Sequence, residues 1–250
     1  DDMTDNFGFM QNHSMSVSGG SEKTVYRIGV GYTGEDGILI TDKDSYDRLN
    51  LSTFMGVDVN SWLTTQLDLK YGNSKQKKVE AGGRNTVWVA AMNLPSYQNN
   101  EDYEENGTVY PAESPATYIR YGDPRRIKRN DLRALGRIIL SPLKGLKITG
   151  EYTYNRTTEQ NKFYKNKYQY IGMNFTGVLN STENSSYAVT SKYTDYNAVN
   201  LFANYDMTFG KHDISVMGGY NQESSHTESQ YSYRTDVVVG SLPSLSLSTG

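Results

Sequence analysis

Two neighbouring segments decide the fold: VNLFANYDMTF at residues 199–209 and ISVMGGY at residues 214–220. In the first segment, every second residue is apolar, namely Val199, Leu201, Ala203, Tyr205, Met207 and Phe209. The intervening positions are largely polar and include Asn200, Asn204, Asp206 and Thr208. Strict alternation predicts a β-strand with one apolar and one polar face. Because only a tight link at Gly210–Asp213 separates the two segments, we expect two successive strands.

The same alternation recurs along most of the chain and predicts an all-β protein. We expect about eight strands, near 12–18, 24–33, 46–58, 61–73, 131–140, 146–158, 197–209 and 212–223. Several are about ten residues or longer, whereas five or six is usual in soluble sheets. The polar face carries charge deep inside the strands, at Asp68, Lys70, Arg133, Arg137, Glu151 and Asp206. The pattern favours an antiparallel transmembrane β-barrel with a polar lumen and aromatic girdles. A twisted antiparallel sheet with one solvated face is the alternative.

Composition excludes several other classes. The 250 residues carry 25 Lys+Arg against 28 Asp+Glu, a formal net charge of -3, which gives no basic field for nucleic acid. The chain has no Cys, so it offers no disulfide and no thiolate site. No run of about 18 apolar residues is present, so no transmembrane helix is expected.

The connections between the expected strands alternate between short and long. Tight links lie at Gly19–Lys23, Asn60–Ser61, Pro142–Gly145 and Gly210–Asp213, and long links at 74–130, 159–196 and from 224 onward. Outer-membrane barrels alternate short periplasmic turns with long extracellular loops in this way. The direction of the first and last strands then requires further strands on both sides, so we expect this chain to be part of a larger barrel.

Residues 12–40 resemble a known family. They contain NHSMSVSGGSEKT at 12–24, the strand from Tyr26 to Tyr32, and EDGIL at 35–39. Supporting segments are YDRLNL at 46–51, SWL at 61–63, PLKGLK at 142–147 and YDMTFGKH at 205–212. The first segment resembles the plug-to-barrel junction of SusC/RagA-type TonB-dependent outer-membrane transporters.

The resemblance implies about eight strands of a 22-stranded barrel around an N-terminal plug. Residues 1–11 would be the plug-to-barrel connection and residues 12–250 the N-terminal part of the barrel, without the plug and the C-terminal strands. By the same resemblance, the parent protein imports oligosaccharides or peptides across the outer membrane of a Bacteroidetes-type bacterium. A SusD-like surface lipoprotein would capture the substrate, TonB would act through the absent plug, and outer-membrane lipid would surround the barrel. Nucleic acid is not an expected partner.

Aromatic residues in the 74–130 link are the candidate substrate contacts: Trp88, Tyr97, Tyr103 and Tyr110. Such rings can stack on sugars or peptide side chains, although packing within the loop or against a partner is the more common role. The run Val87–Met92 is a candidate helical turn docked inside the barrel. The basic group Arg125, Arg126, Lys128 and Arg129 could face lipopolysaccharide phosphates, or it could be a solvated strand end.

No catalytic, cofactor or metal site is expected. The acidic groups 101–105 and 42–47 match no calcium-loop template, and His13, His212 and His226 have no zinc-ligand spacing. No serine nucleophile motif is present. Two other classes compete with the transporter: a soluble β-sandwich that binds surface glycans or acts in adhesion, and a complete small eight-stranded barrel.

Overall fold

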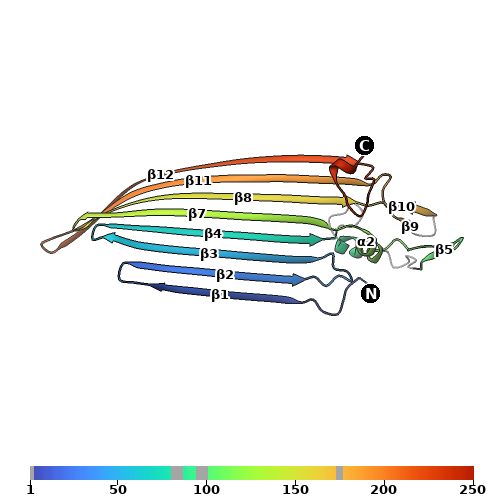
Figure 1. The fold of residues 1–250 in the computed structure, drawn as a ribbon, viewed down its shortest axis with the longest axis horizontal. Coiled ribbons are helices and arrows are strands. Elements are labelled where there is room, and N and C mark those ends of the chain that lie inside the picture. The colour runs from blue at the N-terminus through green and yellow to red at the C-terminus, as the bar shows by residue number, and fades with distance from the viewer. Residues whose placement is uncertain (1–2, 80–86, 94–100, 173–176) are drawn as a thin grey trace.

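The computed structural model describes residues 3–79, 87–93, 101–172 and 177–250, and its main element is one eight-stranded sheet (Figure 1). The strands are β1 (Met10–Gly20), β2 (Thr24–Asp36), β3 (Ser45–Asn60), β4 (Leu63–Lys78), β7 (Arg125–Leu143), β8 (Leu146–Lys165), β11 (Ser186–Phe209) and β12 (His212–Thr235). They are adjacent in the order in which they follow each other along the chain, and all neighbours are antiparallel. The all-β prediction and all eight strands are confirmed.

The strands are longer than the sequence pattern predicts, so three of the expected loops are shorter. β7 begins at Arg125, β8 extends to Lys165, and β11 and β12 each contain 24 residues. The predicted links at 74–130, 159–196 and from 224 onward were therefore wrong in their bounds. These extensions consist mostly of polar residues, with only scattered apolar ones, so the strict alternation that marks a strand is absent. The ladder of backbone hydrogen bonds nevertheless continues because it does not depend on side-chain type.

Tight turns and long connections occupy opposite ends of the sheet (Figure 1). The turns that join β7 to β8 and β11 to β12 each use a glycine at positive φ, Gly145 at 84° and Gly210 at 63°. Glycine adopts this left-handed conformation without a steric penalty, which allows a tight reversal. Both chain termini and all the other elements lie at the opposite end, which we call the loop end.

The elements at the loop end are short. They are α1 (Val87–Met92), β5 (Tyr103–Glu105), β6 (Thr108–Tyr110), α2 (Pro115–Tyr121), β9 (Gln169–Ile171), β10 (Val178–Asn180) and the 3-10 turn η2 (Leu245–Leu247). The predicted helical turn at Val87–Met92 is confirmed as α1; its docking inside a barrel stays a prediction. None of the helices in the described ranges is long and apolar enough to cross a bilayer.

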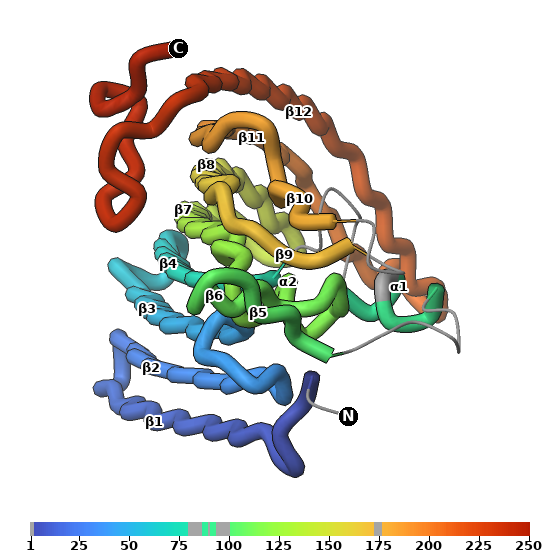
Figure 2. Tube along the Cα trace, turned by 90° about the vertical axis from the view of Figure 1, so that its right-hand side faces the viewer, coloured from blue at the N-terminus to red at the C-terminus, as the bar shows by residue number. Residues whose placement is uncertain are grey.

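The sheet is curved and open. The view from the loop end shows it bending from β1 to β12 (Figure 2). Within the described residues, β1 and β12 pair only with β2 and β11, so the sheet does not close on itself. A complete eight-stranded barrel would require β1 to pair with β12, and this arrangement is therefore not the one observed.

Candidate functional site

The register of the sheet places the alternating apolar residues on one continuous face. Directly opposed residues in an antiparallel pair point to the same side of a sheet. One row of opposed residues crosses five strands from β1 to β7 and consists of Met15, Val30, Leu51, Tyr71 and Leu132. The apolar side chains on this face are well exposed, for example Ile28 at 55%, Ile138 at 52% and Leu201 at 50%. We call this surface the apolar face.

Aromatic residues border the apolar face at both ends. Towards the loop end, five tyrosine hydroxyls donate to a polar side chain: Tyr32 to Asp47 (2.8 Å), Tyr71 to Asn130 (3.2 Å), Tyr152 to Asn197 (2.7 Å), Tyr154 to Asp195 (2.9 Å) and Tyr220 to Gln222 (2.9 Å). Towards the turns, Tyr26, Trp62 and Phe209 are all exposed. From Val199 to Phe209 the apolar segment of β11 is about 34 Å long, or about 26 Å in height at a tilt of about 40°. These dimensions match the lipid-facing band of an outer-membrane barrel.

The opposite face, which we call the polar face, carries paired charges. A second row of opposed residues contains Gln66, Arg137, Glu151, Asn200 and Asn221. Arg137 donates from Nε to Glu151 Oε1 at 2.5 Å and from Nη1 to Gln66 Oε1 at 3.0 Å. Asn200 donates to Glu151 at 3.4 Å and accepts from Asn221 at 2.6 Å. Hydrogen-bonded side chains thus connect five strands across this face.

In the middle part of the sheet, the polar face is more crowded than the apolar face. Thr149, Thr153 and Ala198 lie on it and are buried, at 4%, 7% and 5% exposure. Side chains converge on the concave side of a curved sheet, so this burial identifies the polar face as the concave one. A cavity of 350 Å³ on this face is lined by Arg48, Asn50, Lys70, Asp131, Arg133 and Asn155. Such a surface suits contact with water and polar solutes.

Of the four predicted substrate contacts, the structure brings two together. Tyr103 and Tyr110 are opposed at the open end of the β5–β6 hairpin, with Tyr103 at 38% exposure and Tyr110 half-buried. Trp88 lies on α1, a different element, and is 44% exposed. Tyr97 lies outside the described residues. Their role in substrate contact stays a prediction.

The sequence analysis missed α2, although its signals are present. Ser114 occupies the N-cap and its hydroxyl accepts from the Thr117 amide at 3.2 Å, and Pro115 is the first helical residue. Both are standard features of a helix start. The helix contributes Ile119, which is fully buried against Leu39, Val79 and Val87. This small core holds the loop end together.

One lysine fixes the end of α2, and no sequence pattern identifies it. Lys43 donates from Nζ to three carbonyl oxygens, those of Ile119 (3.1 Å), Arg120 (2.6 Å) and Gly122 (2.9 Å). A cation at a helix C-terminus satisfies carbonyls that have no partner in the helix. Burial lowers the pKa of Lys43, although the nearby Asp123 acts in the opposite direction.

A group of tyrosines lies beside α2. The rings of Tyr121 and Tyr168 stack with centroids 5.7 Å apart, and Tyr170 lies 6.2 Å from Tyr168. Tyr118 donates from its hydroxyl to Glu113 at 2.9 Å. Burial, together with the carboxylate of Glu113, raises the pKa values of both Tyr118 and Tyr168. These hydroxyls therefore stay protonated, and the group is a packed structural cluster.

The acidic and histidine groups form no metal centre in the described residues. No cluster of three or more His, Cys, Asp or Glu side chains has the geometry to hold an ion there. Asp102 accepts from the Ala112 amide at 3.0 Å, and Asp47 accepts from Tyr32. Both carboxylates therefore have structural partners in the fold.

Fold and surface together define a class: a curved wall of long antiparallel strands, apolar on the convex side and polar on the concave side. Known proteins share this architecture. The chain is 21% identical over 235 residues to TonB-dependent receptor P3 of Formosa agariphila, covering 90% of this chain and 22% of that protein. It superposes on the RagAB peptide transporter with a TM-score of 0.74 and 16% identity, and on the open-open state of the RagAB peptide importer with a TM-score of 0.76. No protein-family model matches the chain.

The expected similarity to TonB-dependent transporters is confirmed. The chain is a distant homologue of a TonB-dependent receptor, and its fold matches part of a RagAB chain. It spans about a quarter of these relatives, 22% of the receptor and 27% of each RagAB chain. The named relatives are a receptor and peptide transporters and not enzymes, as the sequence predicts for this chain.

Proposed function

We propose that this sheet is part of the barrel wall of a TonB-dependent transporter in a bacterial outer membrane. The apolar face would contact lipid, and the polar face would line the interior. The observation that supports this most directly is the apolar face itself, which is continuous across eight strands, half exposed and bordered by aromatic residues at both ends. The similarity to a TonB-dependent receptor and to RagAB agrees with this assignment.

Peptides are the first substrate class to test, because the similar solved structures are those of a peptide transporter. Oligosaccharides are the second, since exposed rings such as Trp88 and Tyr103 can stack on sugars. A SusD-like lipoprotein would cover the loop end, and TonB would act through a plug. We further propose that Tyr103 and Tyr110 contact the substrate together, because they are opposed on one hairpin.

Mass spectrometry of detergent-extracted outer membranes tests the proposal. Peptides of this region should belong to a barrel-sized protein that carries a plug and co-purifies with a surface lipoprotein. A 250-residue chain in the soluble fraction would contradict it. On the intact complex, Tyr103→Ala and Tyr110→Ala should weaken substrate binding, whereas Tyr231→Ala, which removes an exposed ring from β12, should not. Equal effects of all three variants would show that the β5–β6 hairpin is not part of the substrate-binding site.

The soluble β-sandwich is not supported. It requires a second sheet packed on the apolar face, against Tyr26, Ile28 and the alternating residues of β11. In the ranges that the structure describes, the other two sheets have only two strands each, and Ile28 and Leu201 remain half exposed.

A further inference from the structure

A basic patch lies on the apolar-face side of the sheet, directly beyond its aromatic border. Towards the loop end, six cations lie on this side: Lys75 and Lys77 of β4, Lys128 and Arg126 of β7, and Arg156 and Lys162 of β8. Other residues of these strands on the same side are the uncharged Asn73, Asn130, Thr158 and Gln160. The register separates the six cations from Arg125 and Arg129, which point to the polar side. Only two members of the basic group at 125–129 can therefore face lipid.

The cations oppose one another directly. Lys75 lies opposite Lys128 on one side and opposite Asp47 of β3 on the other. Lys77 lies opposite Arg126, which in turn lies opposite Lys162. Like charges in directly opposed positions repel and destabilise a sheet unless an anion lies between them. Lys75, Lys128 and Lys162 make no ion pair or side-chain hydrogen bond with any described residue. The patch thus has a repulsive arrangement that an external anion would relieve.

The carboxylates nearby already have partners. Asp195 accepts from Tyr154 and lies 3.7 Å from Arg156, and Glu228 accepts from Tyr193. The guanidinium of Arg156 also lies over the ring of Tyr193, 5.0 Å from its centroid. These contacts hold Arg156 in place. Lys77 lies 3.8 Å from Asp42, and Arg126 lies 3.9 Å from Asp123. Among the described residues, the cations of the patch without an ion pair are therefore Lys75, Lys128 and Lys162.

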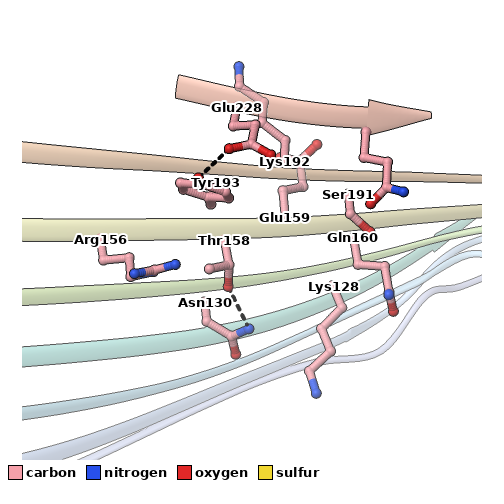
Figure 3. A pocket seen from close by; sticks show the side chains of 11 residues that line it. Lys128, Asn130, Arg156, Thr158, Glu159, Gln160, Ser191, Lys192, Tyr193 and Glu228 are labelled. Atoms are coloured by element: carbon pink, nitrogen blue, oxygen red, sulfur yellow. Dashed lines mark hydrogen bonds between the residues drawn. The ribbon is translucent and has the colours of Figure 1, made fainter. Parts of the chain in front are cut away.

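A cavity of 370 Å³ adjoins the patch on the same side (Figure 3). Its lining includes Lys128 and Arg156 together with amide and hydroxyl side chains from Asn130, Thr158, Gln160 and Ser191. Two acidic residues, Glu159 and Glu228, also line it, and Glu228 accepts from Tyr193. Asn130 donates to Thr158 at 3.1 Å (Figure 3). Amides and hydroxyls are suited to binding a polyhydroxylated group, and the neighbouring cations are suited to phosphate.

The position of the site determines what can reach it. Asn130 accepts from Tyr71 at the aromatic border, and Lys128 lies two residues further, about 7 Å along the strand. The polar headgroup layer on each side of a bilayer is about 5–8 Å thick. Lys128 and the cavity would therefore lie at headgroup depth.

We propose that this patch and cavity bind the phosphorylated sugar headgroup of an outer-leaflet glycolipid. The lysines and arginines bind the phosphate, and the amide and hydroxyl side chains of the cavity bind the sugar hydroxyls. This inference rests on the proposed function, because it requires the apolar face to lie in the outer membrane.

The test uses the full-length transporter in neutral detergent, titrated with diphosphorylated lipid A and followed by native mass spectrometry. The double variant Lys75→Gln/Lys128→Gln should bind this lipid about 30-fold more weakly, since each cation near a membrane surface contributes comparably. The matched control Lys70→Gln/Lys147→Gln removes two lysines from the polar side, neither of which lines the cavity, and should leave binding unchanged. Lipid A without phosphates should bind the unsubstituted protein as weakly as the double variant binds diphosphorylated lipid A.

Three results would overturn the inference: equal binding of both lipids, equal effects of the two double variants, or displacement of the lipid by millimolar inorganic phosphate. The last result would assign the site to soluble phosphate. A spin label at Val216→Cys separates these failures from failure of the proposed function. If the label contacts lipid, but lipid A binds equally well with and without its phosphates, the headgroup site is contradicted and the barrel wall is not. A label in water would contradict the barrel wall.

Discussion

An arginine at Val216 tests which face of the sheet contacts lipid. Val216 lies on the apolar face of β12 and is 59% exposed, whereas its neighbour Met217 lies on the polar face and is 73% exposed. The two substitutions Val216→Arg and Met217→Arg each replace an exposed apolar side chain on the same strand with the same cation. They differ only in the face that receives the charge.

The expected cost follows from the position of Val216. β12 begins at His212, so Val216 lies about 13 Å along the strand, or about 10 Å along the membrane normal at a tilt of about 40°. This places it near the middle of an apolar band about 25 Å tall. An arginine at the midplane on the lipid side destabilises a barrel by about 2–4 kcal/mol. On the polar face, Met217→Arg should change stability by less than about 0.5 kcal/mol.

The assay is equilibrium unfolding in urea of the full-length protein folded into lipid vesicles, compared between the two variants and the unsubstituted protein. Val216→Arg should lower the unfolding midpoint, and Met217→Arg should leave it nearly unchanged. If Met217→Arg costs as much as Val216→Arg, the assignment of the two faces is wrong.

Three further predictions concern the loop end. Lys43→Met removes three hydrogen bonds to carbonyl oxygens at the end of α2 and should destabilise the docking of this helix by about 2–3 kcal/mol. Hydrogen exchange of residues 115–121 measures this change, and unchanged exchange would refute the capping role. Ser114→Ala should cost about 1 kcal/mol at the other end of the helix in the same experiment, whereas Ser114→Thr should cost much less. Because the folded state raises the pKa values of Tyr118 and Tyr168, their stabilisation is complete below pH 10 and is lost as the pH rises further. A pH titration followed by the absorbance of phenolate should show this loss of stability, and Tyr118→Phe should make the loss smaller. If Tyr118 and Tyr168 titrate at pH 10 as free tyrosine does, the buried cluster is contradicted.

The parts of the fold that the sequence predicts are those where one physical pattern acts alone. Within the apolar band, one face of each strand is apolar and the other is polar, so residues 199–209 alternate strictly and are recognisable for this reason. In residues 222–235 both faces are polar, so only the backbone ladder maintains the strand and no pattern marks it. The hairpin β5–β6 has Asn106 and Gly107 at its turn, both at positive φ, which is a recognisable local signal.

The candidate site divides in the same way. Alternation alone predicts a polar and an apolar face. The register predicts which residues oppose each other, and it cannot be obtained from one strand at a time. Lys43 lies 76 residues before Ile119, so its contact with α2 depends on the packing of distant segments. The opposed lysines of β4 and β7, Lys75 and Lys128, depend on pairing across 53 residues in the same way.

The charge pairs of the polar face have a consequence for any solute that moves along it. Arg137 is matched by Glu151, and Arg129 is matched by Asp131. Each pair presents a short-range dipole, whose field falls off faster with distance than that of a single charge. A charged cargo moving along these pairs meets shallow wells of alternating sign, in which it would dwell only briefly. Along this part of the surface the fold therefore favours passage over retention.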